Sequence, residues 1–81
     1  MYFTYILYSK TSDRYYVGYT SDLSKRLEKH NDGNSRSTKS GIPWEIIYHE
    51  EFELKTEAQA RERAIKKRKS RKYIECLIKN T

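Results

Sequence analysis

The chain has 81 residues, of which 36% are apolar and 35% are charged. This length predicts one domain over residues 1–81 with a thin core, because so short a chain buries only about 60% of its unfolded surface. No apolar run approaches the roughly 20 residues of a membrane span, and the N-terminus lacks the basic start of a signal peptide. One cysteine, Cys76, excludes an internal disulfide. We therefore expect a cytoplasmic protein without membrane or disulfide partners; its oligomeric state stays open, and a monomer is plausible.

The net charge of +6 comes entirely from the last third of the chain. Residues 1–55 carry eight Lys and Arg against eight Asp and Glu, whereas residues 56–81 carry nine against three. Between residues 61 and 72, eight of twelve positions are basic. Such a run attracts polyanions through phosphate contacts, although a solvated helix face would have the same composition. A membrane-surface helix is disfavoured, because Ala64 and Ile65 are the only apolar residues of the run.

The first predicted elements form a hairpin. Residues 2–8 are apolar or aromatic at nearly every position, which is typical of a strand buried on both faces. Residues 9–13 are turn-forming, and residues 14–19 again have the composition of a strand. We therefore expect antiparallel pairing, with the first strand at the centre of the sheet.

A short helix, a loop and a third strand follow. Leu23 and Leu27 lie one turn apart behind capping residues, which predicts a helix over about residues 22–31. Residues 33–43 are rich in Ser and Gly and indicate an exposed, mobile loop. Residues 44–52 predict the third strand.

Two further helices are predicted near the end of the chain. Thr56 and Gln59 have the spacing of a capping box for a helix over about residues 56–68. Ser70 is a candidate cap for the last helix, in which Cys76 would be a small buried residue. Three apolar residues of that helix would face the core, namely Ile74, Leu77 and Ile78. The order β-β-α-β-α-α predicts an α+β fold in which a three-stranded antiparallel sheet is flanked by about three helices.

Tyrosines are concentrated on the hairpin. Tyr5 and Tyr16 straddle the turn, so we expect them to lie opposite or nearly opposite each other, with both hydroxyls near one spot. Gly18 shares a strand face with Tyr16. A glycine inside a strand suggests that another group approaches the backbone closely. We therefore expect the phenol of Tyr16 to lie beside a space that the missing side chain of Gly18 leaves open.

The first helix contributes two candidates. Arg26 lies about 60° around the helix from Leu23, at the margin of the buried stripe, where its guanidinium would form a rigid fork for a phosphate. His30 lies within the stripe. With this placement, His30 is as compatible with being a helix-end residue, or a core histidine with satisfied hydrogen bonds, as with a role in a site.

Glu62 lies on the helix predicted over about residues 56–68, and it is the only acid between residues 61 and 72. It shares a helix face with Ala58 and Ile65, and a carboxylate on an inward face is costly without a partner. A divalent cation such as Mg²⁺ is one possible partner, and Lys66, one turn later, is another.

In combination, these residues resemble the GIY-YIG nuclease superfamily, in particular its small stand-alone YhbQ/YazA-like branch. The matching features are Tyr5, residues 16–23 with Gly18 as the motif glycine, residues 26–31 and residues 62–66. The resemblance covers nearly the whole chain, and what makes it specific is the order and spacing of these motifs. Phe3 and Thr4 stand where the first half of the family motif has glycine and isoleucine.

The resemblance implies hydrolysis of phosphodiester bonds with one divalent cation, Mg²⁺ or Mn²⁺. It implies that Glu62 holds the cation and that Arg26 contacts the phosphate. Tyr5 or Tyr16 would take a proton from the attacking water. His30 would orient a neighbouring group or relay a proton.

Basic residues would hold the substrate backbone beside this site. The candidates are Lys25, Lys29, Arg36, Lys39, Arg61, Lys66, Lys67, Arg68, Lys69, Arg71 and Lys72. The expected partner is nucleic acid, with DNA favoured over RNA. Two alternatives remain: a nucleic-acid-binding module that keeps the scaffold without turnover, and an interaction domain whose basic face meets an acidic protein.

Overall fold

The computed structural model describes residues 1–33, 36 and 38–79. Within them, the strands are β1 (Tyr2–Ser9), β2 (Arg14–Thr20) and β3 (Trp44–Phe52), and the α-helices are α1 (Leu23–Asn31), α2 (Lys55–Arg68) and α3 (Arg71–Lys79). A short 3-10 helix, η1 (Lys39–Gly41), precedes β3. The predicted α+β fold with the order β-β-α-β-α-α is confirmed.

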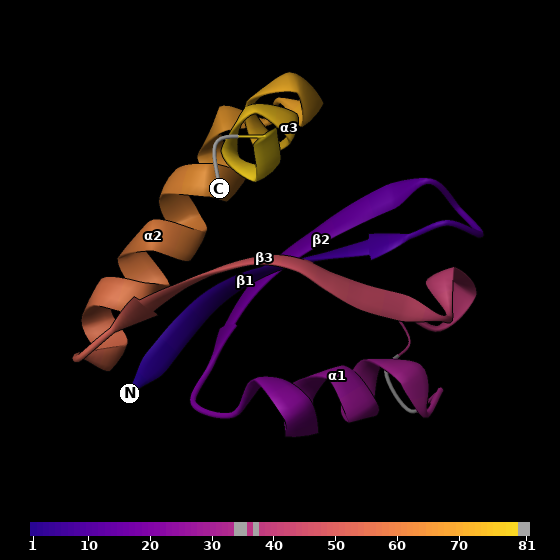
Figure 1. Ribbon diagram of the computed structural model, residues 1–81, viewed down its shortest axis with the longest axis horizontal. Coiled ribbons are helices and arrows are strands. Elements are labelled where there is room, and N and C mark those ends of the chain that lie inside the picture. The colour runs from indigo at the N-terminus through magenta and orange to yellow at the C-terminus, as the bar shows by residue number, and fades with distance from the viewer. Residues whose placement is uncertain (34–35, 37, 80–81) are drawn as a thin grey trace.

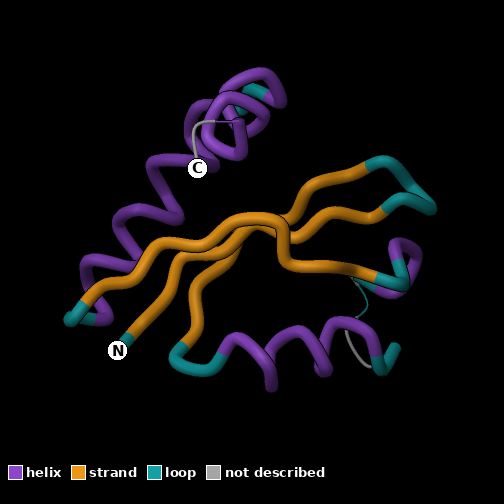
Figure 2. Tube along the Cα trace, in the orientation of Figure 1, coloured by secondary structure: helices purple, strands orange, loops and turns teal. Residues whose placement is uncertain are grey.

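The strands form one antiparallel sheet in the order β2-β1-β3, so the central position predicted for β1 is also confirmed. Helix α1 lies on one side of the sheet, and α2 and α3 lie on the other (Figure 1). Figure 2 shows the three strands running side by side between these helices. Both faces of β1 are therefore covered, which explains why its sequence lacks a polar face.

Alternation along the strands divides the core in two. Tyr5 and Leu7 of β1 pack with Trp44 of β3 and with Leu23 and Leu27 of α1. The core on the opposite face is built from Ile6, Val17, Ile65, Tyr73, Ile74 and Leu77. Each helix thus buries its apolar stripe against one set of strand residues, and together they hold the sheet from both sides.

The hairpin register differs slightly from the expected one. Tyr5 pairs with Gly18, and Leu7 pairs with Tyr16, so the two tyrosines share a face but are diagonal neighbours. Ser9 is the last paired residue of β1, which leaves a four-residue turn. The position of that turn sets the register, and the composition of the turn did not fix it.

The starts of α2 and α3 have different caps. The prediction of a capping box at Thr56 is wrong, because α2 begins at Lys55 and Leu54 is the N-cap residue. Glu57 accepts a hydrogen bond from the backbone N–H of Leu54 at 3.2 Å. Ser70 caps α3 as expected, because its hydroxyl accepts from the Tyr73 N–H at 3.2 Å.

The prediction that Cys76 is buried is wrong. Cys76 is a free, exposed thiol on α3. The inward stripe of α3 contains Ile74 and Leu77, and Cys76 lies about 200° around the helix from Ile74. The apolar residues Ile74 and Leu77, close to Cys76 in the sequence, were therefore not sufficient to predict whether its thiol is buried.

The segment before β3 is more buried than expected. Thr38 is fully buried and Gly41 is buried, although Lys39 and Ser40 are exposed. The Trp44 indole N–H donates to the Thr38 carbonyl at 2.7 Å, and a Cβ on Gly41 would collide with the Trp44 ring. The prediction of an exposed, mobile loop is therefore wrong for Thr38 and Gly41. Residues 34, 35 and 37 of that loop lie outside the described residues.

In the described part of the chain, no helix is both long and apolar enough to span a bilayer.

Candidate active site

A polar cleft of about 560 Å³ opens along the edge strand β2, between the start of α1 and one face of α2. Ten residues line it: Tyr2, Tyr5, Tyr16, Gly18, Tyr19, Thr20, Ser21, Arg26, Lys55 and Glu62. Four of the predicted site side chains, from β1, β2, α1 and α2, therefore reach one hollow.

Tyr5 forms the floor of the cleft. Its side chain is 2% exposed, and its hydroxyl lies 3.1 Å from Nε2 of His30. Burial raises the pKa of the Tyr5 phenol well above its ordinary value, and the nearby positive charge of Arg26 offsets this only in part. Tyr5 is therefore a neutral hydrogen-bonding group at neutral pH.

His30 connects Tyr5 to the segment before β3. It is 4% exposed, and its Nδ1 lies 3.1 Å from the Thr38 hydroxyl. Burial, followed by the charge of Arg26, lowers the pKa of His30, so the imidazole is neutral around pH 7. His30 does not line the cleft wall; it fixes the position of Tyr5 from behind.

Gly18 leaves room for Tyr5. A Cβ on Gly18 would lie 2.5 Å from the Tyr5 hydroxyl and 2.7 Å from the adjacent ring carbon. The cleared space predicted beside Tyr16 therefore exists, but the ring of Tyr5 occupies it.

Tyr16 presents its phenol to the cleft. Its ring packs edge-on against His30, with centroids 4.8 Å apart, and the ammonium of Lys66 lies 5.8 Å from the Tyr16 ring centroid. Its hydroxyl makes no hydrogen bond with any residue that the structure describes. The phenol is thus held by its ring while its oxygen stays available.

Arg26 stands at the side of the cleft formed by α1. Asp22 caps that helix by accepting from the Lys25 N–H at 3.0 Å, which fixes the first turn beside the cleft. The Arg26 side chain is exposed and has no side-chain partner among the described residues. Its guanidinium is therefore free to bind a phosphate from solvent.

Glu62 is the one carboxylate among the residues that line the cleft. Its side chain is 17% exposed, and its Oε1 lies 3.8 Å from the ammonium of Lys66. Ala58 and Ile65, on the same helix face, are fully buried, as the spacing predicted. No group of three or more His, Cys, Asp or Glu suited to a metal occurs in the described residues, so a cation here would depend on Glu62 with water and substrate oxygens.

Sequence reasoning missed five residues that line the cleft: Tyr2, Tyr19, Thr20, Ser21 and Lys55. Lys55 precedes Glu62 by seven residues, which places the two about 20° apart around α2. That spacing could have identified Lys55. Tyr19 accepts a hydrogen bond from the Gln59 side chain at 2.8 Å, which ties β2 to α2 beside the cleft.

The predicted nucleic-acid-binding residues divide into two groups. Three arginines have intramolecular partners: Arg61 binds Glu50 through two hydrogen bonds of 2.9 and 3.1 Å, Arg71 binds Asp13 at 2.7 Å, and Arg68 stacks on Tyr73 at 4.3 Å. The second group is exposed and has no ion pair among the described residues; it contains Lys25, Lys29, Arg36, Lys39, Lys67, Lys69 and Lys72. Lys66 is also exposed, but it pairs with Glu62. Lys25 and Lys29 border a hollow next to the cleft, with Arg26 lining both. The arginines that hold the fold together are therefore poorer candidates than the lysines.

Comparison with known proteins shows the family of the chain. The model of the GIY-YIG catalytic domain matches residues 1–74. The chain therefore belongs to the GIY-YIG family, a class of nuclease-type domains. Within that class, its relatives are UPF0213 proteins.

A relative from Lactococcus lactis, UPF0213 protein YsiG, is 42% identical over 81 residues, which cover 98% of this chain and 76% of the relative. UPF0213 protein SpyM50708 from Streptococcus pyogenes is 44% identical over 57 residues, and the match spans 62% of that relative's length, less than two thirds of it. The solution structure of UPF0213 protein BH0048 from Bacillus halodurans aligns with a TM-score of 0.61 and 31% identity, covering all of this chain and 86% of that one.

Proposed function

We propose that this protein is a metal-dependent nuclease that hydrolyses phosphodiester bonds of DNA or RNA in the cleft. The observation that carries the proposal is that the Tyr16 phenol, the Arg26 guanidinium and the Glu62 carboxylate line one solvent-open hollow. In the same order, these groups would accept a proton, bind a phosphate and ligate a cation. Membership of the GIY-YIG family supports the same chemistry.

The donor set fits one Mg²⁺ or Mn²⁺ ion. Magnesium sites on nucleic-acid enzymes commonly use one or two carboxylates and complete the octahedron with water and phosphate oxygens. Glu62 would hold the ion, which when bound polarises the scissile phosphate and stabilises charge on the leaving oxygen. In the free protein, Lys66 neutralises the Glu62 carboxylate.

The remaining steps use groups of the chain itself. Arg26 binds a non-bridging phosphate oxygen and stabilises the negative charge that develops there. Tyr16, whose oxygen is available, would act as its phenolate and accept the proton of the attacking water, while the water oxygen bonds to phosphorus and the bond to the leaving oxygen breaks. Tyr5 and His30 act behind Tyr16, because the hydrogen bond between them holds the floor against which the Tyr16 ring packs.

The test is a cleavage assay with single-stranded, duplex, nicked and branched DNA and RNA, in Mn²⁺, in Mg²⁺ and in EDTA. We expect products only with a divalent cation, and none from Glu62→Gln, which cannot supply a carboxylate. Glu28→Gln, on an exposed position of α1, is the matched control and should cut normally. Absence of products from every substrate, or cutting in EDTA, would overturn the proposal.

A second candidate is a nucleic-acid-binding module without turnover. The Glu62–Lys66 ion pair favours it, because the carboxylate is satisfied without a cation. Binding that weakens steeply with salt, requires no metal and yields no product would indicate this function instead.

A further inference from the structure

A second hollow continues the cleft along the free edge of β2. It has a volume of about 440 Å³ and lies between residues 13–17 of the hairpin and residues 65–74 of α2 and α3; we call it the hairpin groove. Tyr16 and residues 18–20 border the cleft, and residues 13–17 border the groove, so Tyr16 lines both. On α2, Glu62 borders the cleft and Lys66, one turn later, borders the groove. The two hollows thus form one track beside the same strand.

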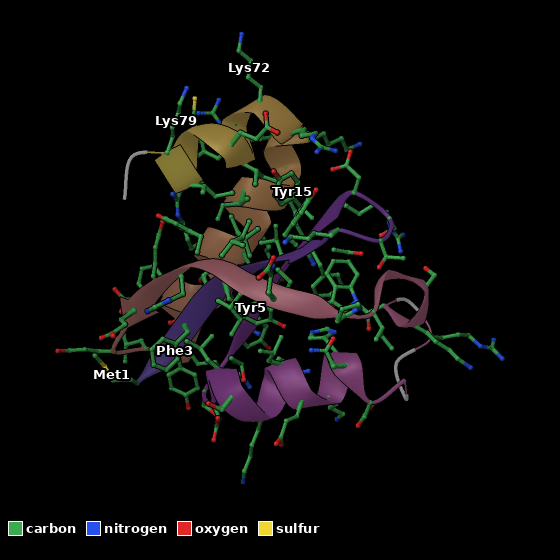
Figure 3. The ribbon with its side chains drawn as sticks, turned by 45° about the vertical axis from the view of Figure 1, so that its right-hand side comes forward. Met1, Phe3, Tyr5, Tyr15, Lys72 and Lys79 are labelled. Carbon is green, nitrogen blue, oxygen red and sulfur yellow. The ribbon has the colours of Figure 1, made fainter. Side chains whose placement is uncertain are left out.

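The floor of the groove is apolar, unlike that of the cleft. Val17 is 6% exposed and Ile65 is 1% exposed, and both line the groove. Ile74 of α3 and the Tyr15 ring, each half-buried, complete the apolar lining. Figure 3 shows Tyr15 on the side of the sheet that carries α3. Such a floor favours a flat group with apolar faces.

The rim of the groove is basic. Its charged residues are Arg14, Lys66, Lys69 and Arg71 against one acid, Asp13. Four positive charges and one negative charge give the lining a net charge of +3. Lys66 and Lys69 are exposed, and both lie toward the end of α2. The rim therefore complements an anionic backbone.

Contacts of Arg71 connect the two walls of the groove. Arg71 donates to the Asp13 carboxylate at 2.7 Å and to the Asp13 carbonyl at 3.0 Å, which ties the start of α3 to the hairpin turn. Its guanidinium lies 5.0 Å from the Tyr15 ring centroid. Because these contacts already fix the two walls, a ligand entering the groove does not have to order them.

We propose that the hairpin groove binds the base of an unpaired nucleotide in the same strand whose phosphate occupies the cleft. The apolar floor takes the faces of the base, and Lys66 and Lys69 take its backbone phosphates. The base must be unpaired, because a base inside a duplex has both faces stacked and its edge occupied. An acidic peptide would satisfy the rim but leave the apolar floor without a partner. The position of the cleaved phosphate rests on the proposed function.

The experiment measures binding in EDTA, so that it does not depend on turnover. The probes are fluorescent oligothymidine, an abasic oligomer with the same number of phosphates, and oligoglutamate. Base stacking and apolar contact predict that oligothymidine binds at least about fivefold more tightly than the abasic oligomer. Equal affinities, or oligoglutamate binding as tightly as oligothymidine, would overturn the proposal.

Two pairs of variants locate the preference. Ile74→Trp fills the groove and should abolish the difference between the two oligomers, whereas Ile78→Trp, on the same helix but not lining the groove, should preserve it. Unfolding midpoints of both variants confirm that they fold. Lys69→Gln should weaken oligothymidine binding more than Lys72→Gln, whose side chain points away from the molecule (Figure 3). A base preference that survives Ile74→Trp would overturn the assignment to the groove.

Failure of this inference and failure of the proposed function are distinguishable. A protein that prefers bases in EDTA but cuts nothing contradicts the nuclease and leaves the groove as a base-binding site. A protein that cuts but binds both oligomers equally keeps the nuclease and removes the groove from substrate recognition.

Discussion

Tyr5 and Gly18 are directly opposed across β1 and β2, and the ring of the tyrosine occupies the space where any other residue would place its Cβ. The glycine therefore serves the internal packing of the site and not the entry of substrate. The hydroxyl that it accommodates reaches His30, so this one cross-strand pair determines where the floor of the cleft lies.

Gly18→Ala should destabilise the protein by about 1–3 kcal/mol, because the new methyl group overpacks a buried contact. Urea unfolding monitored by circular dichroism measures the change. In a Tyr5→Ala background the same substitution should cost much less, because the colliding ring is gone. An equal cost in both backgrounds would contradict the steric role assigned to Gly18.

Tyr16→Phe should reduce the cleavage rate by about 10²- to 10⁴-fold, the usual contribution of a general base. Tyr5→Phe removes a buried hydrogen bond, so we expect a smaller loss of rate together with about 1 kcal/mol of lost stability. Single-turnover cleavage and urea unfolding of both variants separate the two effects. The reverse order of rate losses would assign the proton acceptor to Tyr5.

Protonation of His30 should make the protein less stable at acid pH. Burial holds the pKa of His30 below its ordinary value, so near pH 6 the unfolded chain binds a proton that the folded protein does not. Stability is therefore complete above about pH 6.5 and falls as the pH drops below it. The urea midpoint, measured between about pH 7.5 and pH 5, should follow this trend.

Two histidine variants identify the group responsible. His30→Gln should flatten the dependence in that range, since no titrating ring remains at the buried position. His49→Gln, at an exposed position on β3, should leave it intact. If the slope were instead lost in His49→Gln, the buried ring would not be its source.

Arg61 should contribute to stability and not to nucleic-acid affinity. Burial raises the pKa of Glu50, but hydrogen bonds from Arg61 and Tyr48 outweigh it and bring the pKa below its ordinary value. Arg61→Gln should therefore cost about 1–2 kcal/mol, a modest value because both side chains are partly exposed. The salt dependence of oligonucleotide binding should not change.

Lys67→Gln is the matched control for Arg61→Gln. Lys67 is exposed on the same helix, so its loss should leave the urea midpoint almost unchanged. The slope of log affinity against log salt should decrease by about one. A lower slope in Arg61→Gln would show that the ion pair with Glu50 opens when nucleic acid binds.

Hydrophobic spacing was sufficient to predict the elements of this fold. The two-sided apolar character of residues 2–8 gave the central strand, and Leu23 with Leu27 gave the face of α1 that packs on it. The position of Glu62 between the buried residues Ala58 and Ile65 followed from helix periodicity alone. These features depend on local patterns, which a single sequence carries.

Features that depend on contacts between distant segments were not predictable. The burial of Thr38 follows from the Trp44 indole and the His30 ring, neither of which is a neighbour in the local pattern. The diagonal placement of Tyr5 and Tyr16 depends on where the turn begins. The pairing of Arg61 depends on Glu50, eleven residues earlier on β3. In each case, contacts between distant segments decide between placements that the local sequence pattern does not distinguish.

The cleft takes its walls from β2 and from α2, which α1 and β3 separate in the sequence. During synthesis the chain emerges from the ribosome N-terminus first, so the tyrosines of the hairpin are outside long before residue 62. While α2 is still inside the ribosome, the hairpin lacks the Glu62 carboxylate and one wall of the cleft. The cleft therefore cannot form before α2 has left the ribosome and packed beside the sheet.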